Sequence, residues 1–495
     1  MIWKKELYNN FKKNARMAFI NSDYYSALKN IECAAQIASY YNFIYSDNQL
    51  DELCAQIAAS KILTRIGNKE VNKKKVVYID SNCMDNHGLT QQYIRALRDL
   101  RYEVLFIRIA PVDDACRNII RDVSEYEKGE IICFEKELDI FDKLKIIYER
   151  ICVYNPQYIF FHLLPWDTLA CMLASLIQHP AVQKIYINAI DHTFWIGASF
   201  MDKIIEFRDW GRMVSCRFRG FKSEQCFKLP YYPIINNPQP FNGLPVETNG
   251  KVIIFSGGQS YKMLDRHQTF FCLIDRILEE NSNAIIVLIS LGYNKVIEKS
   301  IKKCKNKDRI IKLGYRKDIF ELYGHIDIYL STFPLGGGLM SQYAAICEKP
   351  ILSYIGKGNA NRSISSSFND NVDAVKSFTN MSDYFEYAHQ LCKDKNFRIS
   401  EGKKIRAAIL APHQFKDGLS DIMERDISPY PFNNVEIRQE EYEHVCEETE
   451  NRYLRRALSI VWSANRWKSF LLFPKNAFAI AKYVTVKKVR KIFSL

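Results

Sequence analysis

The sequence predicts an α/β protein in which two Rossmann-like domains face a cleft, with an α-hairpin before them and a basic helical tail after them. Two series of short apolar strands alternate with amphipathic helices, one in residues 71–235 and one in residues 236–400. This alternation is typical of parallel sheets covered by helices. The length of 495 residues agrees with such a division, because one hydrophobic core rarely serves more than about 250 residues.

Residues 1–70 are predicted to form the α-hairpin. Apolar side chains recur at helical spacing between Ala18 and Ile37, and a second helix is expected from Leu50 to Ile66. The pattern in residues 25–35 is similar to one tetratricopeptide unit, but a single unit cannot form a solenoid. We therefore expect a docking or capping element, for which a protein partner is a candidate ligand.

The first alternation of strands and helices begins where the helical period changes at Lys75. Runs rich in Val, Ile, Tyr and Phe indicate buried strands with helices between them. The expected strands are 76–80, 102–107, 158–161 and 184–187, and the expected helices are 89–100 and 168–177. Prolines and glycines from Pro230 to Gly243 predict an interdomain linker, so the first domain is expected to end near Tyr231.

The second alternation follows this linker. The expected strands are 252–255, 284–289, 309–313, 326–330 and 350–354, and the expected helices are 268–280 and 340–347. Open parallel sheets bind ligands beyond the carboxyl ends of their strands. Two such domains therefore predict an active site between them, and residues 401–450 are expected to add a C-terminal helical segment.

Composition and targeting signals favour a folded cytoplasmic protein. Hydrophobic residues make up 47% and charged residues 25% of the sequence, which is the balance of a globular protein. The 14 cysteines are scattered without a close Cys-x-x-Cys pair, so free thiols in a reducing compartment are expected. No apolar signal core follows Met1, and the longest apolar stretch, Ala284 to Leu291, is too short to span a bilayer.

The basic charge of the chain is concentrated in residues 451–495. This segment holds 11 Lys or Arg and no Asp or Glu, out of a net charge of +13, so the rest is close to neutral. Its cations alternate with aromatic residues such as Trp462 and Trp467, which favours in-plane binding to an anionic membrane surface. A nucleic-acid tail and a helix packed on the first domain are the alternatives. We expect a cytoplasmic protein peripherally associated with the inner face of the plasma membrane, without a nucleic-acid partner.

A strand that runs into three consecutive glycines is the most informative local feature. The strand ends at Leu330, the turn runs from Ser331 to Gly338, and a helix is expected from Met340. Glycines let backbone N–H groups approach a phosphate at the positive end of a helix dipole. A tight turn that needs glycine only for its backbone freedom has the same sequence. The turn alone leaves both interpretations open.

Four stretches of the sequence resemble, in order and spacing, the O-GlcNAc transferase family and its bacterial relatives, which include the HMW1C-like protein glucosyltransferases. The similarity covers roughly residues 75–355 and is strongest in the second half. The four stretches are Ser260–Met263 with the helix and strand that follow, Arg309–Tyr315, Ser331–Gly338 and Asp80–Gly88. The resemblance implies a GT-B fold and transfer of a sugar from a nucleotide-sugar donor.

The resemblance also implies a donor site around Lys262, which matches the family lysine that neutralises the donor diphosphate. A departing nucleoside diphosphate needs a metal ion or a cation with N–H donors, and the sequence has no Asp-x-Asp pair for a metal. No metal or other cofactor is therefore expected. The other donor-binding candidates are Ser260, Gly314, Tyr315, Thr332, Gly336, Gly337, Gly338, Leu339 and Met340.

Two departures from the family pattern leave the nucleotide open. Gly338, Leu339 and Met340 stand where the family has a histidine and two threonines, and Tyr343 stands at the position of the ribose-binding aspartate. Hydroxyl and carboxylate ligands are missing there, although backbone amides can still bind phosphates. UDP remains the nucleotide that the resemblance implies.

Three residues of the first domain are candidates for the catalytic base. His87 matches the family histidine near the sugar and the acceptor, in the turn after the first strand. Asp191 and His192 follow the strand that ends at Ile187, and an imidazole can accept a proton at neutral pH. The alternatives are a turn or capping histidine at position 87 and a helix-capping aspartate at position 191.

Other side chains near these candidates have weaker assignments. Phe194 and Trp195 are expected to form a sugar-stacking or apolar wall, with burial in the core as the alternative. Exposed ion pairs are expected for the charged residues of the next stretch, with contact to an anionic acceptor as the alternative for its arginines. Two histidines beside apolar runs are expected to be structural. The charged residues are Glu206, Arg208 and Arg217, and the two histidines are His162 and His179.

The sequence thus predicts a metal-independent, inverting glycosyltransferase, a hexosyltransferase or N-acetylglucosaminyltransferase that uses UDP-GlcNAc or a UDP-hexose. The acceptor is expected to be a glycan or a protein in cell-surface polysaccharide or glycoprotein assembly. A UDP-sugar epimerase on the same fold needs additional carboxylates, for which no positions are found. A noncatalytic partner of a glycosyltransferase, with a silent site, is the third alternative.

Overall fold

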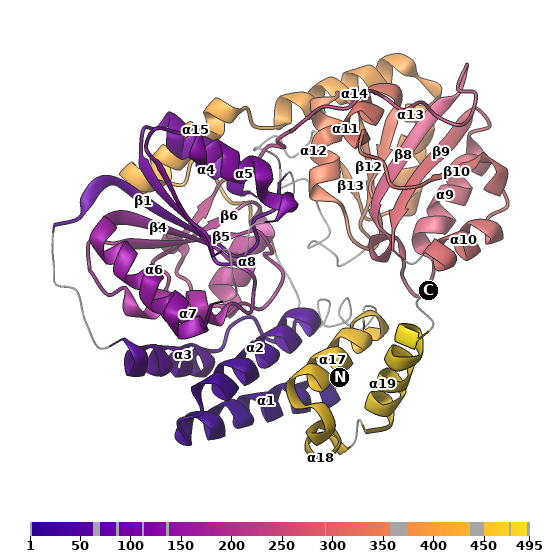
Figure 1. Ribbon diagram of the computed structural model, residues 1–495. Helices are drawn as coiled ribbons and strands as arrows, with labels where there is room; N and C mark the ends of the chain where they lie inside the picture. The colour runs from indigo at the N-terminus through magenta and orange to yellow at the C-terminus, as the bar shows by residue number, and fades with distance from the viewer. Residues whose placement is uncertain are drawn as a thin grey trace.

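A computed structural model shows two α/β domains and a block of helices formed by both ends of the chain (Figure 1). It describes residues 2–62, 70–85, 89–110, 113–134, 138–292, 294–356, 368, 375–435, 450–474 and 477–492.

The first domain contains a seven-stranded parallel sheet with the order β3-β2-β1-β4-β5-β6-β7. Its strands are β1 (Asn72–Asp80), β2 (Glu103–Arg108), β3 (Gly129–Ile132), β4 (Pro156–His162), β5 (Gln183–Asn188), β6 (Lys203–Glu206) and β7 (Cys226–Lys228). Its helices are α4 (Thr90–Asp99), α5 (Arg117–Ser124), α6 (Ile140–Tyr154), α7 (Thr168–Leu176) and α8 (Asp209–Phe218). This is the strand order of a Rossmann domain, with one strand added at the edge.

Successive residues of β1 enter different cores, which explains why this strand is apolar throughout. Val77 and Ile79 pack with α6 and α7, whereas Val76 and Tyr78 pack with α4 and α5. Side chains alternate between the two faces of a strand, so helices on both faces of a sheet require apolar residues at every position. The apolar runs of the sequence therefore predict β1, β2, β4 and β5, but they did not predict the shorter strands β3, β6 and β7.

The second domain repeats this plan in a six-stranded parallel sheet with the order β10-β9-β8-β11-β12-β13. Its strands are β8 (Val252–Gln259), β9 (Ala284–Leu291), β10 (Ile310–Leu313), β11 (Ile328–Leu330), β12 (Ile351–Tyr354) and β13 (Ser377–Phe378). Its helices are α9 (Thr269–Glu280), α10 (Asn294–Lys303), α11 (Ile319–Leu322), α12 (Gly338–Ile346), α13 (Met381–Lys393) and α14 (Lys395–Ala408). Both domains thus have the Rossmann order.

The chain returns to the first domain after α14. Helix α15 (Pro412–Ser420) packs on α4, as Figure 1 shows. Phe415 is fully buried there, and its ring centroid lies 5.1 Å from that of Tyr93. The expected helical segment 401–450 is therefore divided, because α14 belongs to the second domain and α15 covers the first.

The N-terminal region has three helices where the sequence suggested two. They are α1 (Ile2–Ile20), α2 (Tyr24–Tyr41) and α3 (Asn48–Lys61). Helix α1 is mostly polar, and its buried residues are Lys4, Leu7, Tyr8, Phe11 and Ala15. So few apolar positions give a weak periodic signal, which is why the sequence did not reveal α1.

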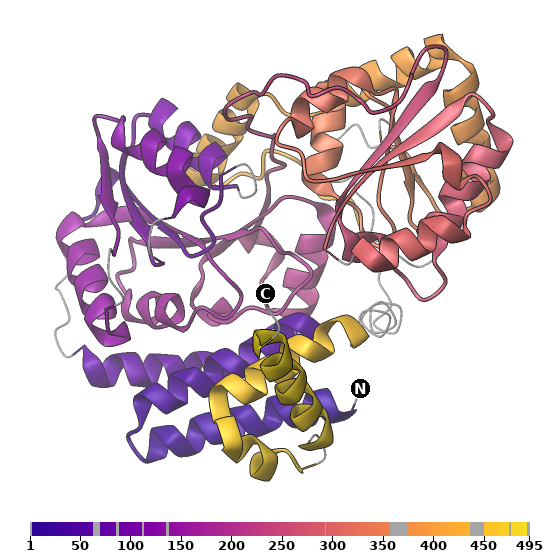
Figure 2. The ribbon, with the colours of Figure 1, turned by 45° about the vertical axis from the view of Figure 1, so that its right-hand side comes forward.

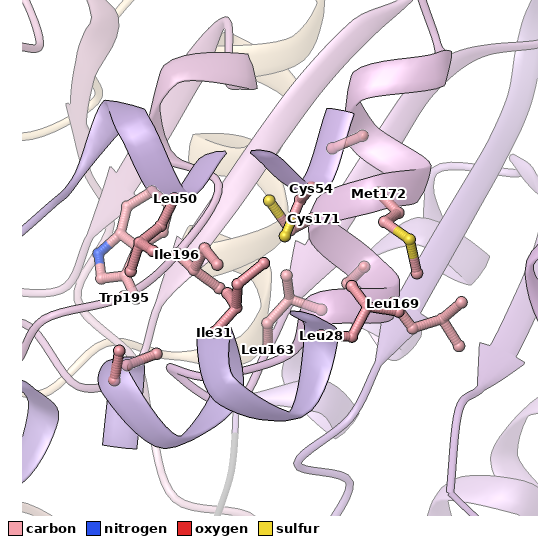
Figure 3. Packing of buried hydrophobic residues seen from close by; sticks show 14 of the residues in the cluster. Leu28, Ile31, Leu50, Cys54, Leu163, Leu169, Cys171, Met172, Trp195 and Ile196 are labelled. Carbon is pink, nitrogen blue, oxygen red and sulfur yellow. The ribbon is translucent and has the colours of Figure 1, made fainter. Parts of the chain in front are cut away.

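Helices α2 and α3 support the loop that follows β5. Figure 3 shows Ile31 and Leu50 packed near Trp195 and Ile196, with Cys54 beside Cys171. Asp51 on α3 accepts hydrogen bonds from the Gly197 N–H at 2.7 Å and from the Ser199 hydroxyl at 2.7 Å. Residues 1–62 therefore cap the first domain and fix one end of this loop.

The C-terminal tail folds back onto these N-terminal helices. Its elements are α17 (Glu450–Asn465), the 3-10 helix η11 (Arg466–Lys468), α18 (Ser469–Leu472) and α19 (Ala477–Ile492). Helix α17 contacts α2 and α19, and Val461, Phe473 and Ile480 are buried in the same core as α1. One apolar side of the tail thus packs inside the protein on the N-terminal helices, whereas the alternative left open by the sequence placed it on the first domain. Among the described residues, no helix has both the length and the apolar character to cross a membrane.

Candidate active site

Two glycine-containing segments meet at the carboxyl ends of β8 and β11. Gly257 lies near the end of β8, and a Cβ atom on it would stand 2.9 Å from the Cε atom of Met340 on α12. Gly337 is the N-cap of α12 and provides no side-chain cap for the first N–H groups of the helix. A side chain at position 257 would therefore have to displace the end of the Met340 side chain and the ring of Phe255 on the same strand.

Lys262 brings a positive charge to this turn. It lies in the 3-10 helix η4 (Ser260–Met263) after β8, and its Nζ atom donates to the Gly336 carbonyl oxygen at 3.5 Å. The amino end of a helix carries unpaired N–H groups and partial positive charge. An ammonium group beside such an end favours binding of an anion such as a diphosphate. The structure thus brings together Lys262 and the glycine turn.

The other donor-site candidates differ in whether their side chains are exposed to solvent or engaged within the protein. Tyr315 follows β10 and is 72% exposed, and open space surrounds the Cβ position of Gly314. The Ser260 and Thr332 hydroxyls instead donate to backbone carbonyls at 2.8 and 2.6 Å, so they fix the turns. Leu339 and Met340 are partly buried against the core of the second domain and supply no hydrogen-bonding side chain.

Tyr343 faces the core of the second domain. It is 6% exposed, and its ring centroid lies 5.5 Å from that of Phe320 and 6.0 Å from that of Tyr323. A residue in this position supports α12 from inside the domain. The position that the resemblance aligned with a ribose ligand therefore carries a packing residue here.

Tyr231 connects the donor turn with the first domain. Its backbone carbonyl accepts a hydrogen bond from Gln342 Nε2 on α12 at 2.7 Å. Its hydroxyl oxygen lies 2.8 Å from the point where a Cβ atom on Gly338 would stand, so only glycine fits there with this tyrosine in place. Its ring packs on Phe207 with centroids 5.5 Å apart. The sequence placed Tyr231 at the domain boundary but gave no sign of this bridge.

Asp191 is held by a buried arginine. The Nη2 atom of Arg208 donates to Asp191 Oδ1 at 2.8 Å, and its Nε atom donates to the other carboxylate oxygen. Burial alone would raise the pKa of Asp191, but the charge of Arg208 and the hydrogen bonds from His192 and Arg208 lower it far below its usual range. Asp191 is therefore a permanent anion near neutral pH.

His192 stands beside this anion and reaches solvent. Its side chain is 44% exposed, and its Nδ1 atom lies 3.4 Å from Asp191 Oδ1. A second buried arginine, Arg219, donates to the backbone carbonyls of Asp191 at 2.9 Å and Thr193 at 2.6 Å. The loop that carries His192 is thus held in two ways. Arg208 binds the Asp191 side chain, and Arg219 binds the loop backbone.

Glu206 completes this charged cluster beneath the loop. Its carboxylate accepts hydrogen bonds from Asn188 Nδ2 at 2.9 Å and from the Ser215 hydroxyl at 2.6 Å. Burial raises the pKa of Glu206 to about 7, against the opposing charge of Arg219. The prediction of exposed ion pairs for Glu206 and Arg208 is therefore wrong, since the end of β6 lies inside the domain.

The first domain also decides several other expectations. Phe194 and Trp195 are at most 1% exposed, and Trp195 stacks on Tyr186 with centroids 3.7 Å apart, so they form core and not a sugar-facing wall. His162 is fully buried at the end of β4, where Nδ1 lies 3.0 Å from the Thr90 hydroxyl. His87 lies outside the described residues.

The charged cluster of the first domain lies close to the donor turn of the second. Burial raises the pKa of Tyr231 to about 12, and the charges of Arg208 and Asp191 also act on this hydroxyl, in opposite directions. The same hydroxyl faces Gly338. Tyr231 therefore contacts the glycine turn of the second domain and lies within the electrostatic reach of Asp191 and Arg208 in the first domain.

Comparisons with solved structures identify the architecture. An O-GlcNAc transferase mutant from Thermobaculum terrenum aligns over 90% of this chain and 82% of its own, with a TM-score of 0.55 and 13% identity. A glycosyltransferase from Rickettsia africae aligns over 72% of this chain and 99% of its own, with a TM-score of 0.51 and 12% identity. The Anabaena protein HepE, in complex with UDP-glucose, aligns over 71% and 99%, with a TM-score of 0.50 and 10% identity.

Sequence comparisons do not reach these proteins, since no family model and no curated protein sequence matches the chain. At 10–13% identity the structural likeness concerns the fold. Two Rossmann domains, the return of α15 to the first domain and these alignments agree with one another. The chain has the GT-B fold of glycosyltransferases.

Proposed function

We propose that the protein transfers a sugar from a nucleotide-sugar donor, with the donor diphosphate bound between Lys262 and the amino end of α12. The observation that carries this proposal is the contact of Lys262 Nζ with the Gly336 carbonyl, in front of an uncapped helix. When the donor breaks, negative charge develops on the leaving diphosphate. A lysine and helix N–H groups can stabilise this charge without a metal ion, and metal independence is part of the proposal.

UDP is the proposed nucleotide, with UDP-GlcNAc or a UDP-hexose as the donor. The support is the exposed Tyr315 ring after β10, which offers a flat apolar surface to a nucleobase. The GT-B protein HepE was solved in complex with UDP-glucose, which makes a UDP-sugar the first donor class to test. Because Tyr343 is buried, the ribose hydroxyls need partners other than the family position.

We propose His192 as the base and Asp191 as its positioning residue. In an inverting transfer the acceptor oxygen bonds to the anomeric carbon while the bond from that carbon to the diphosphate oxygen breaks. The electron pair of that bond leaves with the diphosphate, and His192 takes the acceptor proton. The Asp191 anion would then stabilise the imidazolium through Nδ1. Asp191 itself is a poor base because Arg208 lowers its pKa, and His87 remains the other candidate.

The acceptor and the site of action complete the proposal. We propose a glycan or protein acceptor in cell-surface polysaccharide or glycoprotein assembly, reached at the cytoplasmic face of the membrane. The support is the tail 451–495, which carries 11 basic and no acidic residues. A protein partner at residues 1–70 would meet the exposed apolar side chains of Met17, Ile20 and Tyr25.

Donor turnover by the purified full-length chain tests the proposal. UDP release is measured with UDP-GlcNAc, UDP-glucose and UDP-galactose, with GDP- and CMP-sugars for comparison, across pH 5–9. We expect turnover of a UDP-sugar by the wild type and loss of turnover in His192→Ala. The control is His179→Ala, because His179 is partly buried and its Nδ1 atom accepts a hydrogen bond from the Ala181 N–H in a turn. Asp191→Asn should change the pH profile as well as the rate, which a purely structural role would not do. Release of an isomerised sugar would instead indicate an epimerase, and failure to bind any nucleotide would indicate a noncatalytic partner.

A further inference from the structure

The outer end of the helical block exposes large apolar side chains. Trp467 is 65% exposed, and Leu471 and Phe478 are each 83% exposed. They belong to η11, α18 and the first turn of α19, which follow one another in the chain, and α18 contacts both of the other elements. In Figures 1 and 2 this end of the block points away from both sheets. Single exposed apolar residues are ordinary, but three in consecutive elements form a patch.

The buried side of the same elements fixes this patch in place. Phe473 is 3% exposed, and its ring centroid lies 5.4 Å from that of Phe11 on α1. Ile480, two residues after Phe478, is fully buried. Because both residues belong to the core that includes α1 and α2, the helices cannot rotate to hide Leu471 and Phe478. The exposure is a property of the packed block.

The charges around the patch have one sign. Arg466 and Lys468 flank Trp467 and are exposed, as is Lys482, one turn beyond Phe478. The sequence from 451 to 495 contains no Asp or Glu that could neutralise them. Apolar side chains flanked by cations of the same segment match a surface that is anionic outside and apolar just below, which is the outer layer of an anionic bilayer. An aromatic residue such as Trp467 suits the boundary between the two.

We propose that one fixed surface, the α18 face, docks the protein on anionic lipid bilayers. The α18 face consists of Arg466, Trp467, Lys468, Leu471, Phe478 and Lys482. Leu471 and Phe478 enter the acyl boundary, Trp467 lies at the interface, and the three cations contact lipid headgroups. This inference deepens the membrane association proposed above. It replaces a tail lying free along the membrane with a preformed face whose other side is packed inside the protein.

Co-sedimentation of the full-length protein with vesicles tests the α18 face. Vesicles of phosphatidylcholine with phosphatidylglycerol are compared with phosphatidylcholine alone, at low and high salt. We expect binding to the anionic vesicles, weakened by salt, and a fall of at least tenfold in vesicle affinity for the double variant Leu471→Ser, Phe478→Ser. The matched control is Val153→Ser, because Val153 is 73% exposed on α6. It should bind as the wild type does.

A second measurement needs no loss of binding. Brominated acyl chains should quench fluorescence of the wild type more strongly than that of Trp467→Phe, because the indole would lie at their depth. Equal binding of the double variant and the wild type, or equal quenching in both proteins, would overturn the proposal. Tight binding to a single-stranded oligonucleotide without binding to vesicles would assign the face to nucleic acid and overturn it as well. Donor turnover is measured on every variant and should not change, so failure of the docking face and failure of the proposed enzyme are separate results.

Discussion

The hydroxyl oxygen of Tyr231 lies 2.8 Å from the point where a Cβ atom on Gly338 would stand, although the two residues belong to different domains. A methyl group at position 338 would push Tyr231 away from α12 and disturb the hydrogen bond from Gln342 to its carbonyl. A side chain at position 338 would therefore have to displace the tyrosine hydroxyl at the contact between the two domains.

We therefore expect Gly338→Ala to lower kcat/KM for the donor by about tenfold or more, since small displacements of binding groups are costly. The clash involves only the tyrosine oxygen, so adding Tyr231→Phe should recover much of the loss. A double-mutant cycle on steady-state kinetics measures this coupling. Independent, additive effects of the two substitutions would contradict the proposed contact.

Lys262→Ala should lower kcat by about 10²–10³-fold, the cost of removing one preorganised charge partner of a leaving group. Unfolding should change little because the ammonium makes a single 3.5 Å contact with a backbone carbonyl. The control is Lys305→Ala, whose side chain is 77% exposed in the turn that follows α10. Steady-state UDP release and thermal unfolding of both variants check the prediction. Wild-type turnover in Lys262→Ala would place the diphosphate elsewhere.

The fold was predictable because its strands have few alternatives. The run from Ala284 indicates a strand over 284–289 and the structure gives β9 over Ala284–Leu291, since a strand with helices on both faces must be apolar at each position. The glycine turn and the start of α12 were predictable for a related reason, because a strand, three glycines and a helix leave little choice of local structure. Helix α1 was missed because most of its residues are polar.

The candidate site was less predictable because it depends on contacts between distant segments. Arg208 looks like a surface residue until Asp191, 17 positions earlier, meets it inside the domain. A charged residue is buried only when its partner is buried with it, and sequence spacing does not reveal that partner. The role of Tyr231 could not be predicted from the sequence either, because its contact with Gln342 forms only when the two domains pack together.

The buried carboxyl group of Glu206 should make stability fall as pH rises towards neutrality. Its pKa is raised to about 7 from an ordinary value of 4.5, mainly by burial, so the folded protein binds this proton more tightly than the unfolded chain does. The proton on Glu206 therefore adds on the order of 3 kcal/mol to the free energy of unfolding. This contribution is complete below about pH 4.5 and is lost as the pH rises through about 7.

Glu206→Gln should remove most of this dependence, as measured by urea unfolding midpoints between pH 5 and 8. The exposed Glu224→Gln is the control and should keep the wild-type slope. A weaker slope should remain in Glu206→Gln, because burial also raises the pKa of Asp51 to about 6. An unchanged slope in this variant would show that Glu206 stays ionised in the folded protein.

Cys216 should be the most reactive thiol among the described residues. Its Sγ atom lies 3.6 Å from that of Cys226, and a hydrogen bond from Cys226 together with the nearby charge of Arg212 lowers the pKa of Cys216. We expect iodoacetamide to label Cys216 at pH 7 faster than it labels the exposed Cys272. Mass spectrometry measures the two labelling rates. Arg212→Ala should slow this labelling, because a thiolate there loses its cationic neighbour. In unlabelled protein, oxidised glutathione should accept two electrons and the two thiol protons from the pair, which leaves a Cys216–Cys226 disulfide and two molecules of reduced glutathione. Equal labelling of Cys216 and Cys272 would contradict the assignment of the thiolate to Cys216.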